Sequence, residues 1–211
     1  MDRRSLVQAP RSLHSPRLHL HAPQPDFAEL FVESLNTSLP GLGYIGWGQK
    51  AQTLAWAQKF MADGLRWVDE GDCLIFYAFE TDTGAYVGRV DLHSWDFDAP
   101  RCEVGYVGDV RRAGRGLMRE AVAACIQLAF DLGAARVQAL SEASNQRALH
   151  FAQHALGLSR EGVLRFYERD AQGRLGDQVM FAAYNPGASI STLPTALPPC
   201  PSTSAPPTPR P

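Results

Sequence analysis

Apolar and polar residues alternate along several stretches of the chain, as they do in β-strands with one buried face. Residues 17–23, "RLHLHAP", alternate up to a proline. The apolar residues of 73–96 form two runs separated by Asp82-Thr83-Gly84, a turn sequence. A second such pair surrounds Gln172-Gly173. The predicted strands are residues 17–23, two within 73–96, 101–108, 135–141 and two within 160–184.

Other stretches repeat apolar residues every three or four positions, which predicts amphipathic helices. Asp26 precedes the first of them as an expected N-cap, and glycines at 71, 133 and 157 follow the others. The predicted helices cover residues 25–39, 49–71, 116–133 and 144–157. The first predicted helix is expected to carry four apolar residues on one face, namely Phe27, Leu30, Phe31 and Leu35.

The order of these elements predicts an α/β (α+β) fold. A strand and two helices are followed by three strands, a helix, a strand, a helix and two strands. A helix between two neighbouring strands implies at least one parallel crossover, whereas the meander before it and the hairpin after it are antiparallel. We expect one mixed, twisted sheet of about seven strands with helices on both faces.

The two ends of the chain differ from this middle part. Residues 1–16 carry arginine, serine and proline and are predicted to form a flexible arm. Residues 186–211 hold nine of the 15 prolines with a single charge, Arg210, which predicts a disordered tail. The folded domain is therefore expected at residues 17–185.

The remaining composition is typical of a soluble cytoplasmic protein. The chain has 211 residues, 45% of them hydrophobic, and a net charge of -2. It shows no charge excess that would favour nucleic acid and no apolar run that would span a membrane. The cysteines form no CxxC pair and are expected to be reduced, and the histidines lack metal-ligand spacing, so no metal is expected.

A cationic, glycine-containing turn stands between the strand at 101–108 and the next helix, in "VGDVRRAGRGLMREA" (residues 107–121). The start of a helix presents free backbone N–H groups and a partial positive charge, and glycines let these amides approach an anion closely. Arg111, Arg112 and Arg115 add formal charge. The stretch matches neither the Walker A loop nor the dinucleotide fingerprint. From this stretch alone, a phosphate cradle and a solvated basic turn both remain open.

The surroundings of this turn resemble the acyl-CoA-binding core of the GNAT N-acetyltransferase superfamily. Its signature, Arg/Gln-x-x-Gly-x-Gly/Ala, is matched by "RRAGRG" at residues 111–116. Flanking motifs are similar to those of the ribosomal-protein-type N-terminal acetyltransferases, and the resemblance covers roughly residues 17–184. These motifs are "EVGY" at 103–106, "EAV" at 120–122, "SNQ" at 144–146, "LGL" at 156–158 and "EGVLR" at 161–165.

The resemblance implies that two central parallel strands splay apart and that acetyl-CoA, the co-substrate, lies in the resulting V. It implies a pyrophosphate held by the signature residues Arg111, Arg112, Ala113, Gly114, Arg115 and Gly116. The pantetheine arm would pair with the backbone from Tyr106 and Val107 to Val110 and bond to Asn145. The helix from Asn145 to Gly157 is longer than the family's usual spacing by at least one residue. The resemblance therefore does not decide which of Ser141, Ser144 and Asn145 occupies each of the family's positions in this segment.

Acetyl transfer to an amine requires a base for the ammonium, donors for the oxyanion and a proton source for the thiolate. Glu103 is the first candidate base and Glu168 the second, although either could be a charged strand position paired with arginine. The tyrosine that many family members carry on the last helix is absent, since residues 151–153 read "FAQ". Ser144 is the candidate acid and also a candidate helix N-cap. Tyr106 and Tyr167 are weaker candidates for the acid.

The resemblance implies an N-acetyltransferase whose acceptor is a primary amine, and the subgroup implies a protein N-terminus. A small amine, such as an aminoglycoside or polyamine, and a non-catalytic acyl-CoA-binding module are the alternatives. The aromatic loop at 44–47, with Trp95 and Phe97, could line an acceptor groove or pack on the core. The expected partners are acetyl-CoA and an amine acceptor, and the protein is expected to be a monomer or homodimer.

Overall fold

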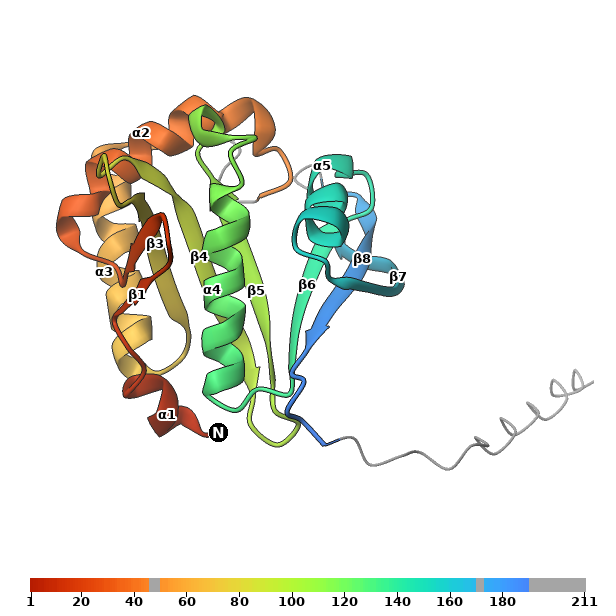
Figure 1. The fold of residues 1–211 in the computed structure, drawn as a ribbon. Coiled ribbons are helices and arrows are strands. Elements are labelled where there is room, and N and C mark those ends of the chain that lie inside the picture. Colours follow the sequence, from red (N-terminus) through yellow and green to blue (C-terminus); the bar gives the residue numbers. More distant parts are fainter. Residues whose placement is uncertain (46–49, 170–172, 190–211) are drawn as a thin grey trace, which may run out of the picture.

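A mixed sheet organises the molecule (Figure 1). In the computed structural model, which describes residues 1–45, 50–169 and 173–189, eight strands lie in the order β1-β2-β3-β4-β5-β6-β8-β7. Every neighbouring pair is antiparallel except β5 and β6, which are parallel. The strands are β1 (Ser12–His14), β2 (Leu18–His21), β3 (Leu74–Glu80), β4 (Tyr86–Asp96), β5 (Arg101–Gly108), β6 (Arg136–Glu142), β7 (Ser159–Arg169) and β8 (Leu175–Tyr184). The predicted mixed sheet is confirmed, with β1 as an additional edge strand.

Helices cover both faces of this sheet, as the order of elements predicted (Figure 1). Helices α2 and α3 lie on one face, and α4 and α5 lie on the other. Apart from short 3-10 turns, the helices are α1 (Arg3–Val7), α2 (Ala28–Ser38), α3 (Leu54–Glu70), α4 (Leu117–Asp131) and α5 (Gln146–His150), which continues into the π-helical η5 (Phe151–Ala155). Within the described ranges, no helix has the length and apolar character needed to cross a membrane.

Capping residues set the ends of α3 and α4. The Thr53 side chain accepts a hydrogen bond from Trp56 N at 3.1 Å and caps the start of α3. Gly71, with φ of 71°, ends α3, and Gly133, with φ of 101°, follows α4. The C-terminal ends of both helices lie where the sequence predicted them, whereas α3 begins at Leu54, later than the predicted residue 49.

Helix α2 differs from its prediction. Asp26 lies inside a 3-10 turn, Pro25–Phe27, and its side chain caps no helix. Phe31 and Leu35 are buried, but Leu30 is 41% exposed. The apolar face of α2 is therefore narrower than the residue spacing indicated.

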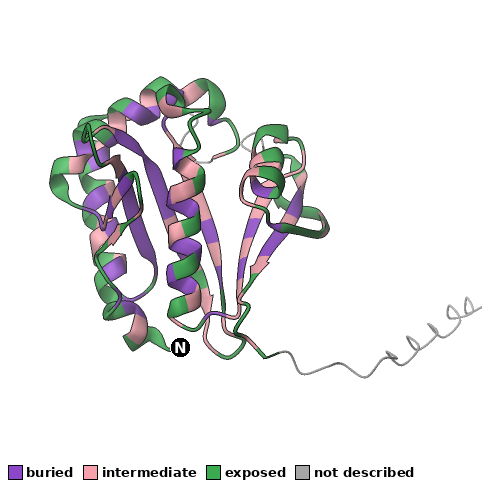
Figure 2. Ribbon diagram, in the orientation of Figure 1, coloured by how far each residue is buried: buried purple, intermediate pink, exposed green. Residues whose placement is uncertain are grey.

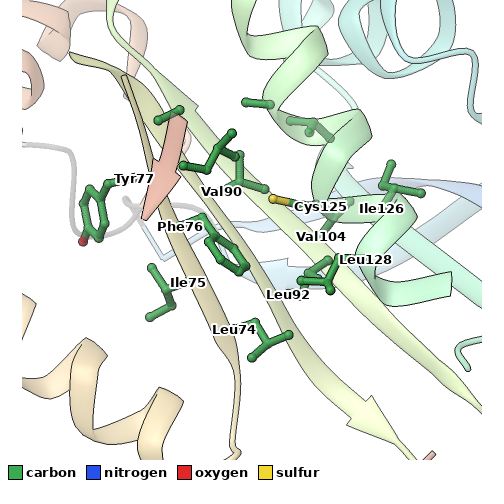
Figure 3. Packing of buried hydrophobic residues seen from close by; sticks show 14 of the residues in the cluster. Leu74, Ile75, Phe76, Tyr77, Val90, Leu92, Val104, Cys125, Ile126 and Leu128 are labelled. Carbon is green, nitrogen blue, oxygen red and sulfur yellow. The ribbon is translucent and has the colours of Figure 1, made fainter. Parts of the chain in front are cut away.

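The core extends over both faces of the central strands. The first five residues of β3, "LIFYA", are all buried, and such an apolar run is typical of a strand that is covered on both faces. Figure 3 shows Leu74 and Phe76 on the side of α4, whereas Ile75 and Tyr77 project from the opposite side of β3. Buried positions concentrate on β3, β4 and the inner face of α4 (Figure 2). This packing holds β5, which carries much of the candidate site, in a fixed position.

The first 16 residues belong to the fold, which differs from the flexible arm expected for them. Leu6 of α1 is fully buried at 0% exposure, and Arg3 pairs with Asp72 beyond the end of α3. Strand β1 pairs with β2 along its whole length. A few apolar anchors therefore order a segment whose composition is mostly polar. At the other end, residues 190–211 of the predicted proline-rich tail lie outside the described residues.

Gly88 of β4 lies where α4 approaches the sheet. A Cβ atom at this position would lie 2.5 Å from the carbonyl oxygen of Val107 and would overlap Met118. We expect Gly88→Ala to lower the free energy of unfolding by about 1–3 kcal/mol, the usual cost of overpacking. Urea unfolding measures this loss. Gly43→Ala is the matched control, because nothing lies within 4 Å of its added Cβ. Equal stability of both variants would contradict the close approach of α4.

Candidate functional site

Strands β5 and β6 pair only at their beginnings and then diverge (Figure 1). The parallel pairs are Arg101↔Arg136, Cys102↔Val137 and Glu103↔Gln138. β5 continues to Gly108 and β6 to Glu142 without further pairing to each other. This confirms the splayed parallel pair, and it leaves one backbone edge of each strand available to a ligand.

Two cavities adjoin at this opening. The first, named here the cradle cavity, has a volume of about 320 Å³ and is lined mainly by the turn after β5, the start of α4 and α5. The second, the carboxylate cavity, has a volume of about 380 Å³ and is lined by Glu103, Glu142 and Glu168 together with neighbouring residues. The residues that line both are Ile45, Tyr106, Asn145 and Ala148. A ligand in one cavity can therefore reach a ligand in the other.

The turn between β5 and α4, residues 109–116, is built around the buried carboxylate of Asp109. Its Oδ1 accepts a hydrogen bond from Arg111 N at 2.8 Å and caps a short 3-10 turn, Val110–Arg112. Gly114 and Gly116 then adopt φ values of 78° and 74°. Glycine takes this left-handed conformation with little strain, so these two positions lead the chain into α4.

The backbone amides at the end of this turn are free to bind an anion. Within the described part of the chain, no group accepts a hydrogen bond from the N–H of Gly114, Arg115 or Gly116. The next residues begin α4, where the first amides have no intrahelical partner. The dipole of this 15-residue helix adds partial positive charge at the same place. The arrangement suits a phosphate or diphosphate.

The three arginines of the turn differ in where they point. Arg112 lines the cradle cavity, and its Nη1 lies 3.5 Å from Glu80. Arg115 binds Glu80 through two hydrogen bonds of 2.6 and 2.8 Å, and Arg111 binds Asp109 and Glu33. Neither Arg111 nor Arg115 lines the cradle cavity. The expected cofactor residues that the structure brings together there are Tyr106, Val107, Arg112, Ala113, Gly114, Gly116 and Asn145.

Asp109 makes the stability of the turn depend on pH. Burial raises the pKa of its carboxyl, but hydrogen bonds from Arg111 and Ser34 outweigh this and hold the pKa below its ordinary value of 3.8. A pKa lowered by folding stabilises the protein above the unfolded pKa, and this contribution is lost as the pH falls through the folded pKa. The turn therefore weakens in acid.

We expect Asp109→Asn to lower the free energy of unfolding by about 1–3 kcal/mol at neutral pH. The difference from the wild type shrinks as the pH falls from about 5 through the lowered folded pKa, because the carboxyl is protonated first in the unfolded state and then in the folded state. Urea unfolding at several pH values measures it. Asp98→Asn, in an exposed turn, is the control. A difference that stays constant over this range would show that the charge of Asp109 contributes nothing.

Asn145 begins α5 at the junction of the two cavities. Its Oδ1 accepts a hydrogen bond from Ala148 N at 3.1 Å, so Asn145, and not Ser144, is the N-cap of α5. The helix then widens into η5, where Leu156 N donates to the carbonyl of Phe151 at 2.9 Å. A π-turn accommodates one extra residue in a helix. This accounts for the extra length that the sequence showed in this segment.

The carboxylate cavity brings both candidate bases together and adds a third glutamate. Its three glutamates come from different strands, Glu103 from β5, Glu142 from β6 and Glu168 from β7. Gln138 Nε2 donates to Glu103 at 3.3 Å, and Gln178 Nε2 donates to Glu168 at 3.2 Å. Arg169 is the cation that also lines the cavity. The excess of negative charge favours a cationic ligand.

The candidate proton donors lie in different environments. Ser144 Oγ donates to Glu142, and Ser144 lines neither cavity. Tyr167 is 54% exposed and also lines neither. Tyr106 is half-buried at the junction of the cavities, and burial raises its pKa to about 12. Tyr106 therefore keeps its proton at neutral pH and can donate a hydrogen bond there.

Glu142, Arg169 and Gln178 are polar residues of the carboxylate cavity that were not predicted from the sequence as site residues. Glu142 could have been found, because strand alternation places it on the same face of β6 as Gln138. Gln178 gave no signal, since its role depends on the pairing of β7 with β8. Of the aromatic loop, Tyr44 and Ile45 line the cavity, whereas Trp47 lies outside the described residues. Trp95 and Phe97 pack on the core.

Comparison with known proteins agrees with this architecture. A family model described as an acetyltransferase (GNAT) domain matches residues 17–156. Among solved structures, the microcin C7 self-immunity acetyltransferase MccE in complex with acetyl-CoA and AMP is 19% identical, with a TM-score of 0.73 over 81% of this chain and 93% of that one. No curated protein matches the chain.

Two ribosomal-protein acetyltransferases are similar in structure as well. The ribosomal α-N-protein acetyltransferase RimL, in complex with coenzyme A, is 17% identical, with a TM-score of 0.71 over 81% of this chain and 95% of that one. The ribosomal-protein-S5-alanine acetyltransferase from Vibrio fischeri is 19% identical, with a TM-score of 0.70 over 83% of this chain and 97% of that one. At such identities the likeness shows a shared fold.

Proposed function

The chain belongs to the GNAT acetyltransferase family, and we propose that it transfers the acetyl group of acetyl-CoA to the N-terminal amine of a protein. The observation that carries this proposal is the junction of the cradle cavity with the carboxylate cavity at Tyr106 and Asn145. A diphosphate-bearing thioester and a cationic amine can therefore meet at one opening. Acetyl-CoA supplies the acetyl group as a thioester.

The cradle fits the diphosphate of acetyl-CoA through backbone amides more than through arginine charge. The unpartnered amides of Gly114, Arg115 and Gly116 would bind its oxygens, and Arg112 would face them from the cavity wall. The open edge of β5 would pair with the amide-bearing pantetheine arm at Tyr106 and Val107. The amide nitrogen of Asn145, whose oxygen caps α5, would donate to the same arm.

Glu103 is the residue that we assign as base. An amine attacks a thioester only when neutral, so a carboxylate has to take a proton from the ammonium first. Glu103 stands at the last pair before β5 and β6 diverge, and its side chain is only 19% exposed. Glu168 lies on β7, an exposed strand with a shift in its pairing at this point. The central strand β5 therefore holds Glu103 more rigidly than the exposed strand β7 holds Glu168.

Tyr106 stabilises charge at the reacting centre by donating a hydrogen bond. With a pKa of about 12, its phenol is a weak acid toward a thiolate, whose conjugate acid has an ordinary pKa of about 8.5. A transfer of its proton to sulfur is therefore unfavourable. The proton that reaches the thiolate comes instead from the amine nitrogen, which has to lose it to form the amide.

The acceptor class rests on the charge of the carboxylate cavity and on the fold that this chain shares with ribosomal-protein acetyltransferases. A protein N-terminus presents one ammonium on an extended chain, which suits a cavity open to solvent. The three glutamates also favour a second candidate, a small amine with several positive charges such as a polyamine or aminoglycoside.

Release of free thiol from acetyl-CoA tests the proposal. The panel contains peptides with varied N-terminal residues, their N-terminally blocked forms, spermidine and kanamycin. We expect turnover with free peptide N-termini and none with the blocked peptides, with the added acetyl group located by mass spectrometry. Turnover with spermidine or kanamycin alone would establish the second candidate. Acetyl-CoA binding, seen as a thermal shift, without turnover on any amine would leave a non-catalytic binding module.

A further inference from the structure

His93 of β4 lies close to two carboxylates, one that lines the carboxylate cavity and one on its own strand. Its Nε2 lies 3.9 Å from Glu103 Oε1 and 3.6 Å from Asp91 Oδ2. The pairing of β4 with β5 places His93 directly opposite Glu103. His93 lines neither cavity, and its side chain is 36% exposed. It therefore links Glu103 to solvent at a place outside the two cavities.

The local backbone fixes the orientation of this imidazole. The pairing of β4 with β5 shifts between His93 and Asp96, and Ser94 in this bulge has a φ of 53°. A non-glycine residue at positive φ is uncommon, and bulges commonly redirect a side chain. Ser94 Oγ lies 2.9 Å from His93 Nδ1. The hydroxyl thus engages one ring nitrogen and leaves the other for the carboxylates.

The charged and titratable groups around His93 come from β4, from β5 and from the residue that precedes β3. β4 contributes Asp91, which forms an ion pair with buried Arg89, and β5 contributes Glu103. Cys73, which directly precedes β3, lies beside Asp91, and burial raises the pKa of its thiol to about 11, so it is uncharged at neutral pH. In the described part of the chain, no side chain of α3 forms a hydrogen bond or ion pair with His93. Among the described residues, Glu103 is thus the neighbouring carboxylate that forms no ion pair with an arginine.

Acetylation of an ammonium releases one proton to solvent per turnover. The new N–C bond forms as the thioester C–S bond breaks, and the nitrogen loses two protons. One ends on the CoA thiol, and the other is taken by the base and has to leave the protein. While acetyl-CoA and the acceptor fill both cavities, Glu103 needs a route that does not pass through them. Histidine is the side chain that exchanges protons near neutral pH.

We propose, on the basis of the proposed function, that His93 receives this proton from Glu103 and passes it to solvent. The separation of 3.9 Å exceeds a hydrogen bond, so a rotation of the Glu103 carboxylate or one bridging water completes the transfer. His93 does not touch the acceptor. It acts through Glu103, whose charged form it restores after each turnover.

Buffer dependence of turnover tests this role in the full-length protein. We expect His93→Ala to lower kcat by about ten-fold in dilute buffer near pH 7, less than the loss of a direct acid–base group. Added imidazole should restore kcat in proportion to its concentration, because a small base can accept the proton where the side chain is missing. The dissociation constant of acetyl-CoA should stay within about two-fold of the wild type, since His93 lies outside the cradle cavity.

Two controls separate proton transfer from a structural effect. His93→Gln keeps a polar side chain of similar length, so it should fold like the wild type and lose kcat like His93→Ala. His14→Ala removes an exposed histidine from β1, and its kcat should neither fall nor respond to imidazole. Wild-type kcat in His93→Gln, or a loss that imidazole does not restore, would overturn the role of His93. Absence of turnover in the wild type itself would instead refute the proposed function.

Discussion

Glu103→Gln should lower kcat by about 10²- to 10⁴-fold, the usual range for the loss of a general base. The amide cannot accept a proton from the acceptor ammonium, so only the fraction of the amine that loses its proton to water can attack. The substitution preserves the size of the side chain and its contact with Gln138. We therefore expect the dissociation constant of acetyl-CoA to be nearly unchanged. Thiol release under saturating substrates measures kcat, and isothermal titration measures binding.

Glu168→Gln is the matched comparison for this prediction, because Glu168 lines the same cavity and accepts a hydrogen bond from Gln178. If Glu103 is the base, Glu168→Gln should affect KM for a cationic acceptor more than kcat, since it removes one attracting charge. A fully active Glu103→Gln across the pH range, together with an inactive Glu168→Gln, would move the base to Glu168.

Gly114→Glu should weaken acetyl-CoA binding by about ten- to a hundred-fold. Two causes act together. A side chain at a φ of 78° is strained by on the order of 1–2 kcal/mol, and this strain disturbs the turn that positions the free amides. The carboxylate also repels the diphosphate, with an energy of about 1 kcal/mol or more near the surface. Isothermal titration with acetyl-CoA measures the change.

Two further variants separate these causes. Gly114→Asn introduces a neutral residue that tolerates positive φ, so it should bind acetyl-CoA better than Gly114→Glu. Gly84→Glu introduces the same charge at a φ of 66° with open space around its Cβ, as at Gly114, but in the turn between β3 and β4. Its affinity should match the wild type. Wild-type affinity in Gly114→Glu would remove residues 114–116 from the diphosphate site.

The sequence was sufficient to predict the elements whose signals are local. The ends of α3 and α4 depend on Gly71 and Gly133, and each glycine lies within two residues of the last residue of its helix. The position of the turn between β5 and α4 was predictable for the same reason, because Gly114 and Gly116 directly precede α4. The mixed sheet followed from the order of its elements, since a strand–helix–strand unit constrains the direction of its strands.

Contacts between residues far apart in the chain could not be predicted in this way. The distant partners of Arg111 and Arg115 are Glu33 and Glu80, which lie 78 and 35 residues away. A basic turn therefore gave no indication of which of its arginines would line the cradle cavity. The N-terminal segment was mistaken for a flexible arm for the same reason, since Leu6 is buried by residues that come much later in the chain.

The π-helical segment that follows α5 determines where a sequence alignment of this region has to place its gap. The extra residue is accommodated at residues 151–155, after Asn145 has capped the helix and before Gly157 ends it. Ser144 and Asn145 therefore keep their places relative to β6, and Leu158 keeps its place relative to β7. A gap placed ahead of Asn145 would pair every residue of α5 with the wrong position in a related protein.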